Sequence, residues 1–580
     1  MVRRDALIAS LISSGLMAGL LPFARIGVDF HHDGIMLKPA LDVLSGQILF
    51  RDTFMQYGAL SCYLQAAALG VHPSLLSLRL LTVAAYGVSL FFLYAAWRLI
   101  LPRALTIISC GLFILFIPYS EKGWLGQYWT LLPWSSVYAM MFQSLGLYAL
   151  FRVIRDEQPE HWGVVLGLAT ACVFWCRQPV GVVMTGCLVL VGGALHWTNW
   201  TPVRRSKQSI LLRVIFGFVL VNALLVLGLF LSGALPDWWY QNFVWPRKWL
   251  LDQTARWYVF KYDFVRPAAG ASLLALGLAA ALPALMQRFR PAFSPRSRTV
   301  YFALLGGVMA WQYERMLEVF ALGAGGWNAL VPCAVLLQAV ISGTQAVVDR
   351  NSSKTKDYYM VSALAVVGLG SLLQFFPVPD SLHIFWSLAP VFGLFVYVFW
   401  RYIGWSPPVV ALVLTAIFLP ALSGKVRSIQ QALARPLVTL DRPALLRGMR
   451  VPQKQAYAVE QIANLSRQIL RHRPDIPSAL IGEDALYLCF TDNKTNVSPY
   501  YVTWPGLADQ PANAKRWSNI QSHRPVMFLH KARWKEVENF YRGSRYVPLL
   551  YLPDHELVIA VPQELADAMG LGAYGAAKKE

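Results

Sequence analysis

The chain has 580 residues, of which 56% are hydrophobic and only 14% are charged. Soluble proteins average about 25% charged residues, so this composition excludes an ordinary soluble enzyme and indicates a membrane protein. The formal net charge is +20, but the basic residues occur in short clusters between apolar runs. That pattern is typical of cytoplasmic loops beside anionic lipids and argues against nucleic-acid binding.

Apolar runs long enough to cross a membrane recur along most of the chain. The first, about residues 6–23, follows Arg3 and Arg4, which are expected to hold the N-terminus in the cytoplasm. A window of about 20 residues predicts about thirteen transmembrane helices. The other twelve are expected near residues 79–98, 105–118, 134–151, 163–176, 180–196, 211–231, 268–287, 300–311, 325–348, 359–376, 384–400 and 409–422.

Basic residues gather in alternate loops, which supports this orientation. The long loops at about 24–78, 119–133 and 233–267 are then predicted to lie outside the membrane. An odd number of spans also places everything after about Gly424 outside, and a miscount by one would reverse the side of this tail. We therefore expect a membrane domain at 1–423 and a soluble extracytoplasmic domain at 424–580.

The C-terminal part changes character. A stretch from Val451 has helical spacing of apolar residues, and a second helix is expected near 535–541. Alternation with short apolar runs predicts a small α/β domain without a glycine-rich phosphate loop. This domain would cap the membrane site, grip an acceptor or act as a scaffold. The apolar runs are 478–481, 486–490, 526–529, 547–551 and 557–561.

The first outer loop has the densest group of ionisable residues, in FHHDGIMLKPALDVLSGQILFRDTFMQYG. Charges near hydrocarbon are costly, so they need a partner or a function. Asp33 precedes Gly34, which would let the backbone turn sharply and present the carboxylate to a substrate as a general base. Asp29 lies one helical turn earlier. The alternative is that Asp33 caps a helix that begins near Ile35.

Two further pairs in this loop allow more than one interpretation. His31 and His32 could bind a metal with Asp33, hydrogen-bond to substrate or to the aspartates, or have a structural role at the interface. Adjacent histidines rarely point the same way, and the loop has no HxH or HxxxH spacing, so we predict no metal site. Arg51 forms either a local ion pair with Asp52 or a contact to a phosphate.

The order of these residues resembles the first outer loop of the GT-C fold glycosyltransferases, which use polyprenyl-phosphate sugars. This superfamily includes protein O-mannosyltransferases and bacterial aminoarabinose-type transferases. The resemblance covers the membrane region and is strongest between residues 28 and 65. It implies an α-helical polytopic protein of the bacterial inner membrane, two juxtamembrane helices in this loop, and an essential carboxylate at Asp33. The matching positions are Asp33, Gly34, Gly46, Phe50, Arg51, Asp52, Phe54, Tyr57 and Gly58.

Two later motifs agree with the resemblance. Glu121 in SEKGW is the candidate for the second acidic motif of the family, although a lysine follows where the family commonly has another acid. An interfacial ion pair with that lysine is the alternative. Arg177 and Gln178 in WCRQPVG match a basic-Gln pair that the family places near the donor phosphate. An arginine at a helix end could also only anchor the interface.

Two other segments fit a lipid-linked donor. In PVPDSLHIFWSLAP, the resemblance implies that Asp380 and His383 line the donor pocket, whereas a helix N-cap at Asp380 or Ser381 is the alternative. The loop at 238–264 interleaves aromatic and basic residues, which would build either a groove for a polyprenyl chain or an ordinary aromatic belt. Its members are Trp238, Trp239, Tyr240, Arg247, Lys248, Trp245, Trp249, Arg256, Trp257, Tyr258 and Lys261.

Together these features predict an inverting glycosyltransferase. The donor phosphate would lie among Arg177, His383 and either Arg51 or Arg315. Asp33 would accept the proton of the acceptor hydroxyl, and fixed cations could neutralise the leaving phosphate, so the sequence does not require a divalent cation. The partners would be a polyprenyl-phosphate sugar, membrane lipids and a lipid, polysaccharide or protein acceptor. A polyprenyl-linked glycan ligase, a flippase or a secondary transporter are the alternatives, and the sugar stays open.

Overall fold

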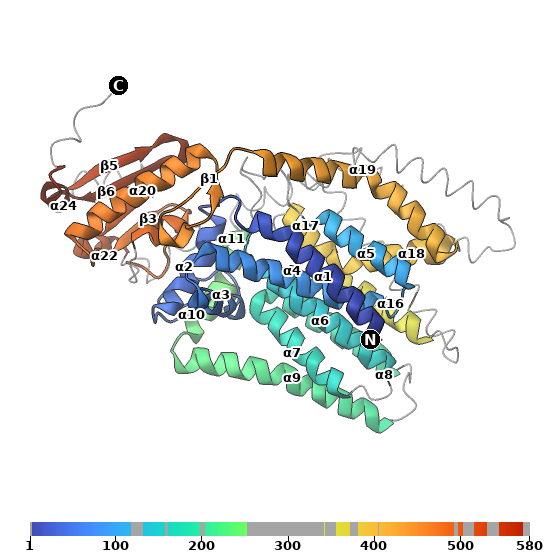
Figure 1. Cartoon of the computed structure of the whole chain (residues 1–580). Coiled ribbons are helices and arrows are strands. Elements are labelled where there is room, and N and C mark those ends of the chain that lie inside the picture. The colour runs from blue at the N-terminus through green and yellow to red at the C-terminus, as the bar shows by residue number, and fades with distance from the viewer. Residues whose placement is uncertain are drawn as a thin grey trace.

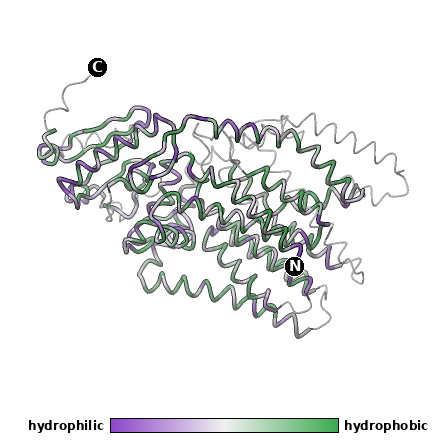
Figure 2. Tube along the Cα trace, viewed as in Figure 1, coloured by the Kyte–Doolittle hydropathy of each residue, from purple (hydrophilic) through white to green (hydrophobic). Residues whose placement is uncertain are grey.

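A computed structural model gives the architecture of the chain, which separates into a helical bundle and a smaller α/β unit at one end of it (Figure 1). Figure 2 shows that the bundle helices are mainly hydrophobic, whereas the α/β unit mixes polar and apolar residues. The residues described by the structure are 3–117, 131–156, 160–197, 204–251, 342, 355–371, 381–403, 405–491, 497–502, 516–530 and 545–571.

Five helices within these ranges are long and apolar enough to cross a membrane. They are Arg3–Ala24 in α1, Leu75–Trp97 in α4, Ser135–Arg155 in α6, Gln178–His196 in α8 and Gln208–Leu231 in α9. The predicted spans at 268–287 and 300–311, and the span at 325–348 apart from Ser342, lie outside the described residues, so the total of about thirteen stays a prediction. The full bounds of the last two helices are α8 (Gln178–Trp197) and α9 (Arg204–Leu231).

The remaining bundle helices are shorter or broken. The predicted span at 384–400 is divided by a 3₁₀ turn, because Pro390 cannot donate a helical hydrogen bond. The last helix continues well past its predicted end at residue 422. These elements are α5 (Arg103–Phe116), α7 (Glu160–Cys176), α16 (Thr355–Ser371), α17 (Ser381–Leu388), η4 (Ala389–Val391), α18 (Phe392–Ile403) and α19 (Pro407–Ala434).

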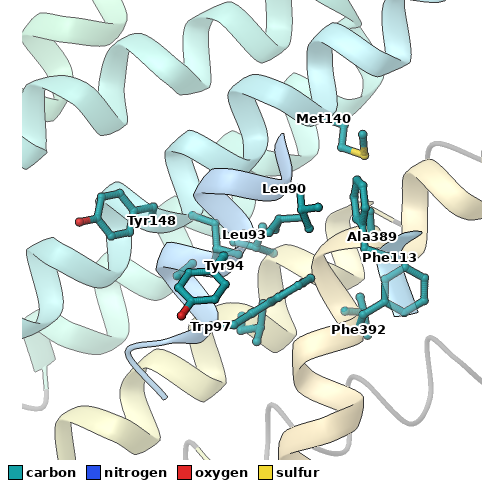
Figure 3. Close-up of a cluster of buried hydrophobic side chains, with 14 of the residues drawn as sticks. Leu90, Leu93, Tyr94, Trp97, Phe113, Met140, Tyr148, Ala389 and Phe392 are labelled. Atoms are coloured by element: carbon teal, nitrogen blue, oxygen red, sulfur yellow. The ribbon is translucent and has the colours of Figure 1, made fainter. Parts of the chain in front are cut away.

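Aromatic and aliphatic side chains form the core of the bundle. Figure 3 shows part of it, where Trp97 of α4, Phe113 of α5 and Phe392 of α18 lie in the same buried cluster. The Trp97 indole also donates a hydrogen bond to the Pro390 carbonyl, 3.2 Å away. The 3₁₀ turn after α17 therefore places a backbone carbonyl, that of Pro390, against α4.

The basic clusters predicted to be cytoplasmic meet at one end of the bundle. Asp5 accepts a hydrogen bond from Arg103 Nε at 2.8 Å and forms an ion pair with Arg98, whose Nε lies 3.3 Å from the Asp5 carboxylate. Arg155 donates to the Leu99 carbonyl, 2.7 Å away. The first outer loop and the α/β unit lie at the opposite end (Figure 1). This separation agrees with a two-sided arrangement, and which end faces the cytoplasm stays a prediction.

The first outer loop contains the two helices that the resemblance implied, α2 (His32–Leu44) and α3 (Ala59–Val71). The third outer loop contains α10 (Leu235–Trp239), the π-helical turn η1 (Tyr240–Val244) and α11 (Trp245–Leu251). The main chain of Phe54 donates to the Pro499 carbonyl at 2.9 Å. The first loop is thus joined directly to the C-terminal part of the chain.

The C-terminal unit is an α/β structure, as predicted. Its four-stranded sheet has the order β3-β4-β6-β5, with β3 and β4 parallel and the other neighbours antiparallel. The predicted run 486–490 is not a strand but part of a 3₁₀ helix, which packs on α2 and also contacts β3. The predicted helix at 535–541 lies outside the described residues. The elements are β1 (Val438–Thr439), η5 (Ala444–Leu446), β2 (Arg450–Val451), α20 (Gln453–His472), β3 (Ser478–Ile481), η6 (Ala485–Thr491), α22 (Arg516–His523), β4 (Val526–His530), β5 (Tyr546–Leu552), η8 (Pro553–His555), β6 (Leu557–Pro562) and α24 (Gln563–Ala568).

One hydrophobic core is shared by the first outer loop and the C-terminal unit. Phe30 and Ile35 belong to the same buried cluster as Leu486, Phe528 and Val561. Backbone hydrogen bonds join the same segments, including Gly27 N to the Arg450 carbonyl at 2.8 Å. This packing fixes the position of the loop that carries the candidate site.

Candidate functional site

Asp29 holds the first turn of α2. Its Oδ1 accepts hydrogen bonds from the backbone N–H groups of His31 (3.0 Å) and His32 (2.7 Å). Its Oδ2 accepts from His32 Nδ1 at 2.9 Å, which fixes the tautomer and the orientation of that ring. The alternative in which Asp33 caps a helix near Ile35 is wrong, because α2 begins at His32 and Asp29 binds the exposed N–H groups.

Asp33 lies inside the first turn of α2 and is fully buried. Its Oδ2 accepts a hydrogen bond from the Asp29 backbone N–H at 2.9 Å and forms an ion pair with the Arg79 guanidinium. Arg79 comes from α4 and is also fully buried. It was not among the predicted site residues, although an arginine inside the apolar run LRLLTVAAYG is a signal that could have found it.

This ion pair leaves polar atoms without partners. Within the residues that the structure describes, Asp33 Oδ1 and the Arg79 Nε and Nη1 groups have no hydrogen-bond partner. Buried polar groups are normally paired, so these three atoms need an explanation. They provide one acceptor and two donors at a single buried point beside α2.

The two aspartates have opposite electrostatic environments. Burial raises the pKa of Asp33, and the nearby Asp29 carboxylate adds to this, while Arg79 opposes it without reversing the direction. Burial also disfavours the charge of Asp29, but His32 and His31, with the hydrogen bonds of His32, outweigh burial and lower the pKa of Asp29 to about 2. Asp29 is therefore a permanent anion, and Asp33 is the carboxyl group better suited to accept a proton.

Three of the predicted site residues lie around the ring of Trp134. The ring centroids of His32, Tyr57 and His383 lie 4.9, 5.6 and 6.1 Å from that of Trp134. Trp386 stacks near it at 6.3 Å. We did not predict Trp134 as a site residue, since nothing in LLPWSS distinguishes it from an ordinary interfacial tryptophan. These residues come from α2, the loop before α3, α17 and the segment before α6.

Arg177 joins the same group between α7 and α8. Its guanidinium lies over the Tyr57 ring, 5.7 Å from the centroid, and Nη1 donates to Ser136 Oγ. Gly58 makes this approach possible, because a Cβ atom there would lie 2.0 Å from the Trp175 carbonyl oxygen. Gln178 instead donates to Asn242 at 2.6 Å, so the adjacent residues contact different segments.

Other predicted residues lie elsewhere. Arg51 forms a two-point ion pair with Asp52 at 2.8 and 2.9 Å and donates to the Ser232 carbonyl at 3.1 Å, which is the local arrangement given above as one alternative. The structure describes no contact between Arg51 and Asp33. Glu121, Arg315 and Asp380 lie outside the described residues, so their roles stay predictions.

The third outer loop is partly packed into the protein. Trp238 stacks on Trp175 at 5.1 Å, and Trp245 contacts Phe54 at 5.3 Å, so both rings are buried. Trp239 is 56% exposed. Among the described members of this aromatic loop, Trp239 therefore fits an interfacial belt or groove better than its two buried neighbours.

The described residues contain no group of three or more His, Cys, Asp or Glu side chains placed to hold a metal ion. The carboxylates of the site are engaged otherwise, Asp29 by N–H groups and Asp33 by Arg79.

Comparisons with known proteins give only remote similarities. No protein-family model and no curated protein sequence matches the chain. Among solved structures, the chain is similar to the oligosaccharyltransferase of Archaeoglobus fulgidus in complex with zinc and sulfate, with 10% identity, a TM-score of 0.48, and coverage of 97% of this chain and 73% of that one.

Two further solved structures have the same character. For the oligosaccharyltransferase AglB of A. fulgidus with an inhibitory peptide and dolichol phosphate, the identity is 11%, the TM-score 0.46 and the coverage 97% and 74%. For ArnT from Cupriavidus metallidurans bound to undecaprenyl phosphate, they are 12%, 0.41, and 96% of both chains. All three TM-scores are below one half, so the proposals below rest on the residues of this chain.

Proposed function

We propose that the chain is a membrane glycosyltransferase that moves one sugar from a polyprenyl-phosphate donor to a hydroxyl acceptor at the outer face of the membrane. The observation that carries this proposal is the state of Asp33. Its carboxylate is buried and anchored by Arg79 through one oxygen, while the other oxygen has no partner in the described part of the chain. A buried carboxyl group with a raised pKa is a suitable general base for a hydroxyl group.

The reaction follows from this arrangement. The acceptor oxygen attacks the anomeric carbon, its proton passes to Asp33 Oδ1, and the bond from that carbon to the phosphate oxygen breaks. The phosphate leaves with the electron pair as polyprenyl phosphate. Attack from the face opposite the phosphate inverts the anomeric configuration. Arg79 keeps the carboxylate in place, because it binds the oxygen that does not react.

Cations and donors near Trp134 suit the leaving phosphate. Arg177 is held by Ser136 and Tyr57, and His383 lies beside Trp134 and Trp386. Fixed positive charges stabilise a developing phosphate anion at little cost in reorganisation. Because Arg51 is already paired with Asp52, we favour Arg177 over Arg51 for this role. Arg315 stays a further candidate from the sequence.

The test compares wild type with Asp33→Asn. Membranes containing each chain would be incubated with a panel of radiolabelled polyprenyl-phosphate sugars and a crude cell-envelope acceptor. We expect one donor to be consumed, with turnover lowered about 10²–10⁴-fold in the variant. Asp475→Asn is the matched control, since it removes an exposed carboxylate from the C-terminal unit. Folded protein is quantified in each membrane.

The outcomes separate the alternatives. Wild-type turnover in a folded Asp33→Asn variant would reject Asp33 as the base. Release of a polyprenyl pyrophosphate would favour the glycan ligase, and sugar movement without any transfer would favour a flippase or transporter. No turnover of any donor by the wild-type chain would reject the proposed function.

A further inference from the structure

The turn after β3 brings a third carboxylate to the candidate site, beside Asp29 and Asp33. His31 Nδ1 donates a hydrogen bond to the Glu483 backbone carbonyl at 3.0 Å, although the two residues lie 452 positions apart in the chain. Asp484 Oδ1 lies 3.9 Å from the same nitrogen. Glu483 and Asp484 belong to the segment GEDALYLCF of the C-terminal unit, for which no site role was predicted. The C-terminal unit thus reaches the loop that carries Asp33.

This contact is fixed by the backbone around it. The Leu486 N–H donates to the Phe30 carbonyl at 3.1 Å, and Tyr487 stacks on Phe30 with ring centroids 4.9 Å apart. A Cβ atom at Gly34 would lie 2.2 Å from Leu486 N, so only glycine permits this approach. Asp484, between these anchored positions and β3, is therefore held opposite His31 by the docked domain.

Asp484 is surrounded by ionisable groups of both signs. The facing groups are Asp29, His31 and His32 at the start of α2, and Glu483 and Tyr487 on its own segment. Burial, then Asp29 and Glu483, raises the pKa of Asp484 to about 6, while His32 opposes the shift. The charge beside His31 therefore changes close to neutral pH. Burial and His32 lower the pKa of His31, while Asp29 and Glu483 favour its charged form.

We propose that Asp484 is a positioning residue for the proposed transferase reaction, which the C-terminal domain supplies to the site to orient His31 and to stabilise its charge. The inference rests on the proposed function, because His31 directly precedes α2, whose first turn carries the proposed base Asp33. It implies that the site is complete only when the C-terminal domain is docked. The role of this domain then goes beyond a scaffold.

The first experiment measures His31 directly and needs no turnover. The full chain in detergent is treated with diethylpyrocarbonate, which reacts with neutral imidazole, and modification of His31 is followed by mass spectrometry between pH 5 and 8. A neighbouring carboxylate favours the imidazolium, so Asp484→Asn should lower the midpoint by about half a unit or more, giving about threefold faster modification at pH values well below the midpoint. The plateau rate at pH 8 reports accessibility and should not change.

Two controls distinguish charge from structure. Asp484→Glu should return the midpoint to the wild-type value. Asp475→Asn should leave it unchanged, because that carboxylate is exposed and lies at the opposite end of β3 from the turn. An unchanged midpoint in Asp484→Asn would overturn the inference. A higher plateau at pH 8 with an unchanged midpoint would mean that the domain had loosened, and this also overturns it.

The second experiment connects the residue to turnover. Wild-type kcat should fall as pH decreases through about 6, where Asp484 loses its charge. Asp484→Asn should have the low kcat of the acidic wild type at every pH, with the donor KM unchanged, and Asp484→Glu should restore the profile. If Asp484→Asn keeps the kcat and the pH profile of the wild type, the proposed role of Asp484 is overturned. If the wild-type chain itself turns over no donor, the proposed function is rejected instead.

Discussion

Removing one partner of the Asp33–Arg79 ion pair should destabilise the protein strongly, whereas replacing both partners should change its stability little. The two side chains are fully buried and form an ion pair. Removing one partner of a buried pair leaves an uncompensated charge, which costs about 3–5 kcal/mol, whereas neutral replacements of both are often about neutral. We therefore expect Asp33→Asn to destabilise the chain by about 3–5 kcal/mol, and the double variant Asp33→Asn, Arg79→Met to recover most of that loss.

The single variants should differ in their dependence on pH. Asp33→Asn has no titrating carboxyl group at this position, so its stability should not depend on the titration of Asp33. In Arg79→Met, Asp33 loses its cation and its pKa, already raised by burial, rises further. A carboxyl group with a raised folded-state pKa contributes stability below its unfolded pKa of about 3.9 and loses it as pH rises through the folded value. Arg79→Met should therefore be more stable at pH 5 than at pH 8.

The assay is thermal unfolding of the four chains in detergent at pH 5 and pH 8, followed by tryptophan fluorescence. Residues in direct contact give non-additive effects in a double-mutant cycle. We expect the double variant to melt above Asp33→Asn at both pH values. Losses that simply add in the double variant, or an Arg79→Met variant that is less stable at pH 5 than at pH 8, would refute it.

Two other substitutions test the contacts of α2. Gly34→Ala would place Cβ 2.2 Å from Leu486 N, so it should separate the C-terminal domain from α2 and raise hydrogen exchange at 485–487, whereas Gly70→Ala meets only a side chain at 3.6 Å and should not. Asp29→Ala removes the carboxylate that accepts hydrogen bonds from the N–H groups of the first turn of α2. It should lower the stability of the protein by about 0.5–2 kcal/mol and reduce turnover by disordering His32. Unchanged stability and turnover would contradict the capping role.

The sequence predicted those elements that depend on local pattern. The four strands of the sheet appeared as short apolar runs, and the long apolar helices were recognised by length. The run at 486–490 has the same composition as a strand, but its place is decided by contact with Phe30 and Gly34, which no local pattern encodes. Gly34 was predicted to permit a sharp turn. It instead lies within α2, where its missing side chain admits the backbone of the C-terminal domain.

The site was predictable only where its residues share one loop. Asp29, His31, His32 and Asp33 lie within five consecutive positions of an outer loop, so their clustering follows from the order of residues alone. Their partners come from distant segments, and each alone has an ordinary explanation. An arginine near a helix end anchors an interface, and an acidic pair after a strand belongs to a turn. Tertiary packing, which brings Arg79 and Asp484 to this loop, supplies the missing half of the site.

The packing supports the proposal that Asp33, rather than Asp29, is the base. The two lie four residues apart at the start of the first outer loop, and the sequence predicted Asp33 as the base from the glycine that follows it and from the resemblance. Asp29 engages both oxygens with N–H groups and with His32, and its pKa is lowered to about 2, so it cannot hold a proton during turnover. Asp33 has one oxygen anchored and the other unpaired among the described residues, and its pKa is raised. In the proposed mechanism, Asp29 orients the start of α2 and Asp33 accepts the proton, a division of roles that matches the opposite shifts of the two pKa values. On this argument, Asp29→Asn would change the acid limb of the rate profile through His32, whereas Asp33→Asn would remove the proton acceptor itself.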